Sequence, residues 1–528
     1  MASRKDELNA YTYARKRTVA AFLQPSPTGT EEGAPRPLRA VLPGLIAGAL
    51  ILAGFGAWGM FKPSAPRDWN DPGRNVIVGS ESTTRYVVLE TDGKAHLHPV
   101  LNLSSARLLL DPSGFGIVSV DEKELDSGRI PHGPALGIPY APDRLPAAGD
   151  AGEAKRWAVC QQPDGDGRSV RQAVFVLADR DAGRVDGPHR LTGGQMLYVQ
   201  GPDQERYLVD AEGTKYLIGG PDPERLPAAD RSLLLRSLVG DGPEPQRVTE
   251  EWLATFDDGS PVEFPALPGT VGEPAGAPVR DAGNDRVGTV LLAPTGAGPQ
   301  HYVVLPGQVV PVSGFTARLL LDSPAAAVLG QEGLPRNVGV QAFTPAPAAE
   351  SIDRQYTWPA ETAQQVNRPD GNGSRDTVCS VLRGVDPQDG STRLSTWAGP
   401  AYPAAVGAGA GSAYVTPGSG LLYRQVQGEQ AEAGGVFLVT DTGLRYAVQS
   451  NTDSGGEDDT GDLPGQEEQG GGDEGEDPAG VPSGRAEQAQ ARLGYGGVEP
   501  VPVPAQWSRL LPTGPRLDTD SARQPQGS

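Results

Sequence analysis

The sequence is poor in the residues that carry most enzyme chemistry. Its 528 residues include two cysteines and five histidines. A metal site needs several such ligands at fixed spacing, and His96 and His98 have no further ligand close by in the sequence. No G-x-x-x-x-G-K-[S/T] or G-x-S-x-G stretch occurs, so neither a phosphate-cradling loop nor a nucleophile elbow can be drawn. We therefore nominate no catalytic residue, no metal ligand and no cofactor.

Positive charge is scarce as well. Lysine and arginine number 45 against 66 acidic residues, which gives a formal net charge of -21. This excess would repel a phosphate backbone, and no dense basic stripe with interleaved aromatics offsets it. Nucleic acid is therefore excluded as a partner. The length exceeds what one hydrophobic core usually serves, so several domains are expected.

One long run without charge lies near the N-terminus, from Ala40 to Phe61. At 1.5 Å per residue a helix of this length spans about 33 Å, and a bilayer core is about 30 Å thick. The run predicts a transmembrane helix at 40–61, because 39 residues precede it and no A-x-A site follows, which disfavours a signal peptide. Basic residues concentrate before it, so we expect a single-pass protein of the cell membrane with segment 1–39 in the cytoplasm.

Small residues and an N-terminal helix supply two candidate contact surfaces. Gly44 and Gly48 form a G-x-x-x-G pair on which a second membrane helix could pack, although glycine facing lipid explains it equally well. The first 23 residues place Leu8, Tyr11 and Phe22 near one face of a helix. This amphipathic helix is expected to dock on a partner or to lie on the inner leaflet.

Both cysteines, Cys160 and Cys379, follow the predicted span. Outside the membrane the compartment is oxidising, so a pair of thiols can persist as a disulfide. One internal bond is the expectation, and two buried free thiols are the alternative.

The chain repeats itself. HPVLNLSSARLLLD ends at Asp111, and VVPVSGFTARLLLD ends at Asp322. Five residues match in the same order at nearly constant separation: Tyr86 with Tyr302, Arg107 with Arg318, Cys160 with Cys379, Tyr198 with Tyr423, and Tyr216 with Tyr446. Such matches indicate an internal duplication. Equivalent residues meet only beside a two-fold axis, so a disulfide between them would place both cysteine segments in a central core with small repeat modules outside it.

The local patterns predict an α+β fold in which small sheets dominate. Short runs rich in β-branched and aromatic residues flank a D-G or E-G turn, as in RYVVLETDGKAHL from Arg85, and indicate hairpins. SSARLLLD and GFTARLLLD indicate short helices that begin at a serine or threonine.

The last 78 residues, 451–528, differ in composition from the rest of the chain. Segment 451–484 is rich in acids and predicts a disordered linker, because such a composition cannot bury a core. Segment 485–528 holds Tyr495 and Trp507 among prolines, which predicts an extended arm that docks on the domain or on another subunit. A loose tail is the alternative.

Taken together, several segments resemble the EccB family, the bitopic membrane subunit of type VII (ESX) secretion systems. The resemblance is carried by RKDELNAYTYARKR, the single span, NVIVGSESTTRYV, LHPVLNLSSARLLL, the paired cysteines, VTDTGLRYAV and LGYGGVEPVPVPAQWSRLLPTGPRLD. It implies an elongated extracytoplasmic domain at 62–450 with a disulfide-linked core and four repeats. On this basis the repeats are expected near 69–130, 186–240, 288–345 and 412–450.

The resemblance also implies a role. The family organises the extracytoplasmic side of a secretion pore as a structural subunit, together with the EccC motor ATPase, EccD and EccE, and with dimer contacts between outer domains. Some members carry an ATPase label, so ATP hydrolysis is an alternative function, although no nucleotide-binding motif is present. The repeats are similar to a wall-binding phage lysin subunit, which makes binding to peptidoglycan a second alternative.

Overall fold

The computed structural model describes residues 3–23, 38–60, 65–163, 169–222, 225–242, 244–370, 375–386, 388–406, 412–427, 434–448 and 483–526. Nearly all of the predicted acidic linker, 451–484, lies outside the described residues. The remainder is an α+β structure with five sheets, as the sequence predicts.

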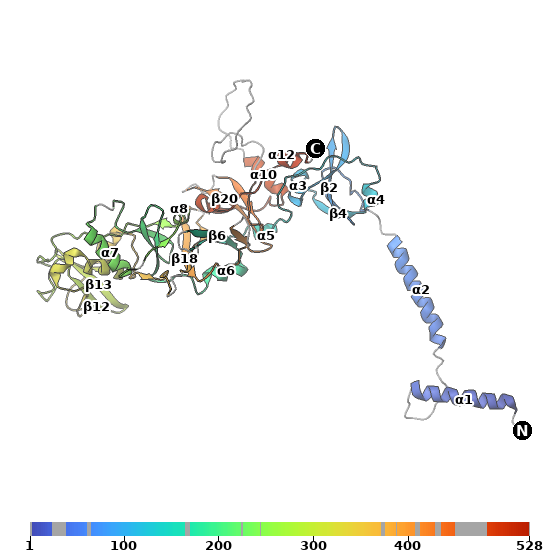
Figure 1. The fold of residues 1–528 in the computed structure, drawn as a ribbon, viewed down its shortest axis with the longest axis horizontal. Helices are drawn as coiled ribbons and strands as arrows, with labels where there is room; N and C mark the ends of the chain where they lie inside the picture. Colours follow the sequence, from blue (N-terminus) through green and yellow to red (C-terminus); the bar gives the residue numbers. More distant parts are fainter. Residues whose placement is uncertain are drawn as a thin grey trace, which may run out of the picture.

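Two helices precede the β-rich part of the chain and stand apart from it (Figure 1). Helix α1 spans Arg4–Leu23 and helix α2 spans Leu38–Met60. Among the described residues, no helix has the length and apolar character that crossing a membrane requires. The predicted span at 40–61 therefore stays a prediction.

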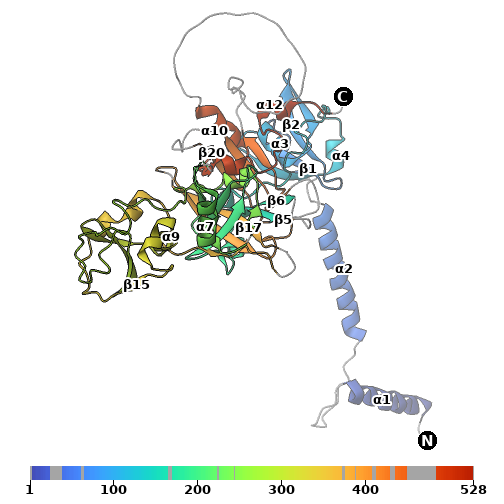
Figure 2. The same cartoon turned by 60° about the vertical axis from the view of Figure 1, so that its left-hand side comes forward.

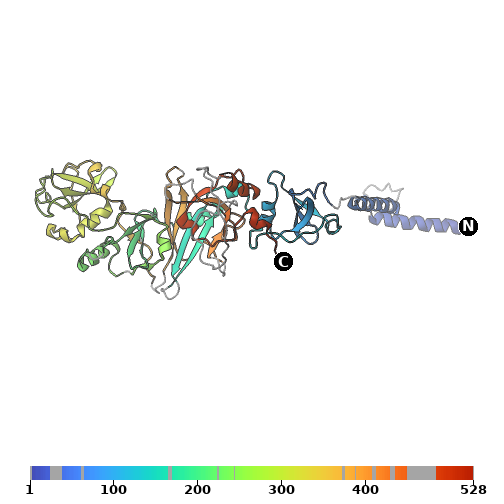
Figure 3. The same cartoon turned by 90° about the horizontal axis from the view of Figure 1, so that it is seen from above.

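A central sheet forms the middle of the β-rich part, with the strand order β18-β17-β5-β6-β19. Its strands are β5 Arg156–Pro163, β6 Val170–Leu177, β17 Thr377–Val385, β18 Thr392–Gly399 and β19 Ala413–Val415. Four further sheets, one for each repeat, lie on either side of it. Viewed from the side and from above, the first and fourth repeats lie at one end of the molecule and the second and third at the other (Figure 1, Figure 3).

The first repeat shows the plan that all four follow. Three antiparallel strands form a meander, a helix follows, and a last strand returns parallel to the first strand. Its elements are β1 Asn75–Gly79, β2 Arg85–Thr91, β3 Lys94–Pro99, α3 Leu103–Leu109 and β4 Gly116–Val120. The predicted D-G turn joins β2 to β3 with positive φ at both Asp92 and Gly93, as two-residue hairpin turns require.

The third repeat follows the first closely, as the matched ARLLLD segments predict. It consists of β12 Val290–Thr295, β13 Gly298–Leu305, β14 Gln308–Val312, α9 Gly314–Leu321 and β15 Arg336–Asn337. Helices α3 and α9 begin alike, since the side chains of Asn102 and Ser313 accept hydrogen bonds from the backbone N–H three residues on. Between its helix and its last strand, the third repeat adds the 3-10 helix η1 at Pro324–Leu329.

The second repeat has β7 Gln195–Gln200, β8 Arg206–Val209, β9 Thr214–Leu217, α7 Ala228–Val239 and β10 Gln246–Arg247. Strands β11 Asp257–Asp258 and β16 Gln364–Gln365 extend its sheet. The remaining short helices are α4 Glu122–Leu125, α5 Ala148–Ala151, α6 Asp179–Asp186, α8 Glu250–Leu253, η2 Ala348–Glu350, η3 Ile352–Gln355, α11 Ala505–Ser508 and α12 Thr519–Arg523.

The fourth repeat is longer than the predicted range 412–450. Its meander is β20 Leu421–Val426, β21 Val436–Val439 and β22 Arg445–Val448, but its helix α10 Ser483–Arg492 and its last strand β23 Val501–Pro504 come from the predicted C-terminal arm. Strand β23 pairs parallel with β20 at the edge of the sheet, where prolines are tolerated. The arm therefore completes a repeat, and the acidic segment interrupts that repeat between its third strand and its helix.

Candidate functional site: the disulfide core and the seams between repeats

The predicted disulfide lies at the centre of the central sheet. Cys160 on β5 and Cys379 on β17 face each other directly across two antiparallel strands, with 4.0 Å between their Cα atoms. Both residues are fully buried. Neither cysteine is free, so the alternative of two free thiols is wrong.

The register around the cystine has the two-fold character that the duplication predicts. Val378 pairs with Gln161 and Ser380 pairs with Val159. The residue before one cysteine therefore faces the residue after the other. Outside this pair, β6 flanks β5 and β18 flanks β17, each antiparallel. A local two-fold axis through the cystine thus relates the four main strands of the sheet.

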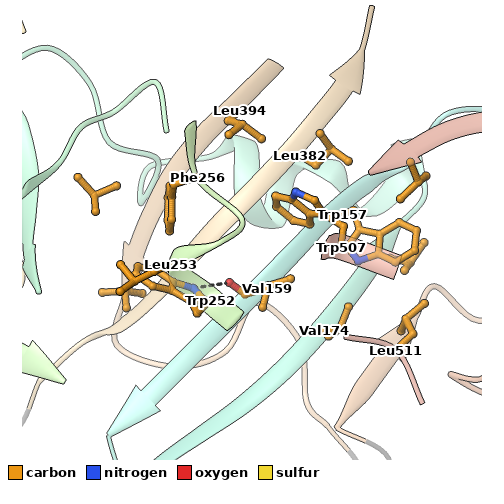
Figure 4. Packing of buried hydrophobic residues seen from close by; sticks show 14 of the residues in the cluster. Trp157, Val159, Val174, Trp252, Leu253, Phe256, Leu382, Leu394, Trp507 and Leu511 are labelled. Carbon is orange, nitrogen blue, oxygen red and sulfur yellow. Dashed lines mark hydrogen bonds between the residues drawn. The ribbon is translucent and has the colours of Figure 1, made fainter. Parts of the chain in front are cut away.

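The sheet buries both faces. One face carries Cys160, Phe175, Cys379 and Trp397 into a single apolar cluster. The other face carries a second cluster, which includes Trp157, Val174 and Leu382 (Figure 4). Burial on both sides explains why these strands read as continuous apolar runs rather than as alternating ones.

Two tryptophans, one from each half, pack on this second face. Trp252 on α8 and Trp507 on α11 are both fully buried (Figure 4). The indole N–H of Trp252 donates a hydrogen bond of 2.9 Å to the carbonyl oxygen of Val159. Each tryptophan lies shortly after the last strand of its repeat, so the two are counterparts.

The duplication therefore continues beyond Tyr446, the last pair matched in the sequence. Gly259 and Gly514 confirm this, because a Cβ on either would come within 2.4 Å of a ring carbon of Tyr216 or Tyr446 respectively. Trp252 and Trp507 are 255 positions apart, whereas the two tyrosines are 230 apart. The separation increases because the acidic segment is inserted into the second half. This change in spacing concealed the last part of the repeat in the sequence.

The first and fourth repeats meet at a seam, which we define as the contact between α3 and α10 together with α12. The guanidinium of Arg107 donates to the carbonyl of Leu493 at 2.6 Å, and that of Arg492 donates to the carbonyl of Leu110 at 2.6 Å. The two arginines occupy matching ARL segments, so the contact is reciprocal. Burial lowers the pKa of Arg107, with Tyr495 acting in the opposite direction.

An ion cluster ties helix α6 to both halves of the core. The carboxylate of Asp186 lies 3.0 Å from Nε of Arg156 on β5 and 2.5 Å from Nη1 of Arg383 on β17. Burial alone would raise the pKa of Asp186, but the hydrogen bonds to Arg383 and Arg156 outweigh it and the pKa is lowered. The cluster crosses the same strand pair as the disulfide, and no sequence motif marks it.

Tyr423 of the fourth repeat contacts the segment that follows the last strand of that repeat. The hydroxyl groups of Tyr423 and Ser508 share a hydrogen bond of 2.8 Å. Burial raises the pKa of Tyr423 to about 12, so this phenol stays neutral in the physiological range.

A family model described as "Type VII secretion system ESX-1, transport TM domain B" (T7SS_ESX1_EccB) matches residues 1–527. The chain belongs to the EccB family. One relative, the ESX-3 secretion system ATPase EccB3 of Mycobacterium tuberculosis (strain ATCC 25618 / H37Rv), is 26% identical over 509 residues, which is 92% of this chain and 83% of the relative. The ESX-1 secretion system ATPase EccB1 of Mycolicibacterium smegmatis (strain MKD8) is 29% identical over 287 residues, 53% of this chain and 54% of the relative.

Solved structures share the fold of this EccB-family chain. The EccB3 dimer from the ESX-3 core complex superposes with a TM-score of 0.53 at 21% identity and covers 85% of this chain and 99% of that chain. A chain of an intact ESX-5 inner membrane complex gives a TM-score of 0.54 at 20% identity and covers 100% of this chain and 96% of that chain.

The other predicted site residues are not brought together with the core. Gly44 and Gly48 lie on α2, and a Cβ added to either would meet no atom within 4 Å, so helix packing there stays a prediction for this EccB-family member. Within the described ranges, no group of three or more potential metal ligands is present.

Removing the reciprocal arginines is expected to weaken the seam. We predict that Arg107→Gln or Arg492→Gln lowers the free energy of unfolding by about 2 kcal/mol, the usual scale for hydrogen bonds made by charged groups. The double variant should lose less than the sum, because the two residues share one contact. Urea denaturation of the solubilised chain measures both effects.

The duplication supplies the control for that experiment. Arg318 is the counterpart of Arg107 in the third repeat, but it pairs with Asp322 at 2.7 Å and its side chain is 46% exposed. Arg318→Gln should therefore cost less than about 1 kcal/mol. Equal losses at Arg107 and Arg318 would contradict the seam.

The Asp186 cluster predicts a pH-dependent contribution to stability. Because the folded-state pKa of Asp186 is lowered, its contribution is complete above the ordinary carboxyl pKa and disappears as the pH falls through the lowered value. The stability difference between the wild type and Asp186→Asn should therefore shrink on acidification. Asp241 forms an ion pair with Arg236, but its carboxylate is 83% exposed. Asp241→Asn should therefore differ little in stability from the wild type at any pH.

Proposed function

We propose that this chain is a structural subunit of a type VII secretion complex and that it organises the extracytoplasmic side of the pore. The observation that carries the proposal is the family match over residues 1–527. The described architecture supports it, because two matched halves joined by a buried disulfide form an elongated body on which several faces are available for neighbouring subunits (Figure 1).

A membrane anchor at 40–61, with the N-terminus in the cytoplasm, forms part of the proposal. The segment carries no charged residue. Its large apolar side chains are mostly uncovered by the part of the chain that the structure describes, since Leu52 and Phe55 are each 76% exposed. Burial of such side chains in hydrocarbon would be favourable by about 1.5 to 3 kcal/mol each, so a lipid environment accounts for this surface.

Assembly with other subunits follows from the same assignment. The related EccB3 structure is described as a dimer from the ESX-3 core complex, and we propose dimer contacts between extracytoplasmic domains for this chain. The EccC motor ATPase, EccD and EccE are the proposed partners. Gly44 and Gly48 are proposed to contact a neighbouring membrane helix.

Native purification tests the proposal. A tagged chain isolated from its own membranes in mild detergent should carry a motor ATPase with it in a large complex. Gly44→Leu combined with Gly48→Leu should weaken this association, whereas Ala53→Leu, on the opposite side of α2 at about 100° per residue, should not. A solitary monomer that never brings down a motor ATPase would overturn the proposal.

Two further measurements distinguish the structural role from the two alternatives, ATP hydrolysis and cell-wall binding. Relatives are named ATPases, and the scaffold proposal requires no hydrolysis by this chain. ATP turnover that follows the purified chain and is abolished by a point substitution in it would support the enzyme instead. Sedimentation of the chain with purified peptidoglycan would support a wall-binding role.

A further inference from the structure

The seam between repeats is closed at one end of the molecule and open at the other. Segment 519–523 forms the helix α12 and packs on α3, with Ala522 fully buried between the first and fourth repeats. Beyond it, the backbone N–H of Gln526 donates to the carbonyl of Ala135 at 2.8 Å. The chain therefore fills this seam with its own C-terminus.

The segment that corresponds to α12 in the other half of the duplication has a different structure. Counting from the tryptophan pair, Phe264 corresponds to Thr519 and Leu267 corresponds to Ala522. No helix forms there, and the seam between the second and third repeats holds a cavity of about 300 Å³. Helices α7 and α9, side by side in Figure 2, contribute Asp230 and Leu320 to its walls.

The third repeat contributes η1, which the first repeat lacks, to the wall of this cavity. Residues of η1 from Pro324 to Ala326, together with Leu329, line the cavity opposite Phe264. Val328, on the same short helix, is 71% exposed. An apolar segment bound in the cavity would also cover Val328.

The polar group at this cavity selects the charge of the occupant. Asp230 lies in the first turn of α7, and its carboxylate makes no ion pair or hydrogen bond with any described residue. The chain as a whole carries a net charge of -21, which would attract a basic partner over a distance. A lysine or arginine of the partner would form an ion pair with Asp230.

We infer that this open seam is a docking site for a short segment of another protein, which inserts one or two apolar side chains between α9 and Phe264 and pairs a lysine or arginine with Asp230. The volume lies at the lower end of the range for ligand pockets, so it suits side chains better than a large cofactor. The seam is far from α1 and α2 (Figure 1), so docking here goes beyond the proposed anchoring role and does not depend on it.

A peptide selection on the full-length chain in lipid nanodiscs tests the inference. The probe is a displayed library of short random peptides, selected on the wild type and depleted on Ala325→Arg, which fills the cavity from an exposed position. We expect the enriched peptides to combine apolar residues with a lysine or arginine. Asp230→Lys should weaken their binding at least about tenfold.

Glu90→Lys is the matched control, since it makes the same charge change at an exposed position of the first repeat and should leave peptide binding unchanged. Circular dichroism spectra that match the wild type would show that each variant folds. The inference fails if no peptide is enriched, if the enriched peptides lack basic residues, or if Asp230→Lys binds them as the wild type does. It also fails if the chain self-associates and Ala325→Arg abolishes this, because the occupant would then be a second copy.

Discussion

Replacing both cysteines by alanine is expected to lower the free energy of unfolding by up to about 5 kcal/mol, the largest effect of any small substitution in this chain. The bond joins residues 219 positions apart, and the chain-entropy model assigns about this value to a closed loop of that length. Strands β5 and β17 remain paired through their backbone ladder, so Cys160→Ala with Cys379→Ala should still fold. Chemical denaturation of the full chain measures the loss.

Reductant provides the matched control for that experiment. Wild-type chain denatured with reductant should show the stability of the double variant, and the double variant should not respond to reductant. Equal stability of wild type and double variant without reductant would mean that the bond contributes little to the joint between the halves.

The second large effect is expected from the C-terminal segment. Truncation after Val448 removes helix α10, strand β23 and a set of fully or nearly fully buried side chains, namely Leu493, Tyr495, Trp507, Leu511, Leu517 and Ala522. The larger of these contribute about 1.5 to 3 kcal/mol each, and their sum approaches or exceeds the total stability of a typical domain. The truncated chain should therefore lose the fold of the first and fourth repeats, measured as rapid proteolysis of both.

Deletion of 453–477 is the matched control, because it removes acidic sequence while keeping every element of the fourth repeat. The second repeat makes the same connection, from Leu217 to Ala228, with a short segment. Shortening the connection should change stability by only about 1 kcal/mol. A deletion as damaging as the truncation would contradict the assignment of α10 and β23 to the fourth repeat.

Sequence patterns predict the duplication and the disulfide because both depend on a few residues with strong local signals. The ARLLLD segments form buried helices, and the D-G turn fixes a hairpin register. Equivalent cysteines leave one internal pairing. The helix and the turn are each determined within a short window, and the disulfide could be predicted because the chain has only two cysteines.

The boundary of the fourth repeat was hidden for a physical reason. Its last strand contains Pro502 and Pro504, which read as extended arm until the edge position of β23 is known. The acidic insertion also shifts the spacing between Tyr446 and Trp507. A third ARL segment at Ala491–Leu493 was the available signal.

Contacts between segments that are distant in the sequence could not be predicted from it. Asp186 meets Arg156 and Arg383 only after β5 and β17 pair, and charged residues are too common for one such triad to stand out. The open seam depends on how closely Phe264 approaches α9. Such distances follow from packing rather than from residue pattern.

The most direct test of the central claim is peptide mapping of the unreduced chain, purified from cells that co-express two copies, one of which is labelled by conservative, mass-changing substitutions in both cysteine peptides. A duplicated domain folded about its own cystine predicts one linked peptide pair, Cys160 with Cys379, in which both peptides always carry the same label. Free thiols at either position, or linked pairs of mixed label, would contradict it.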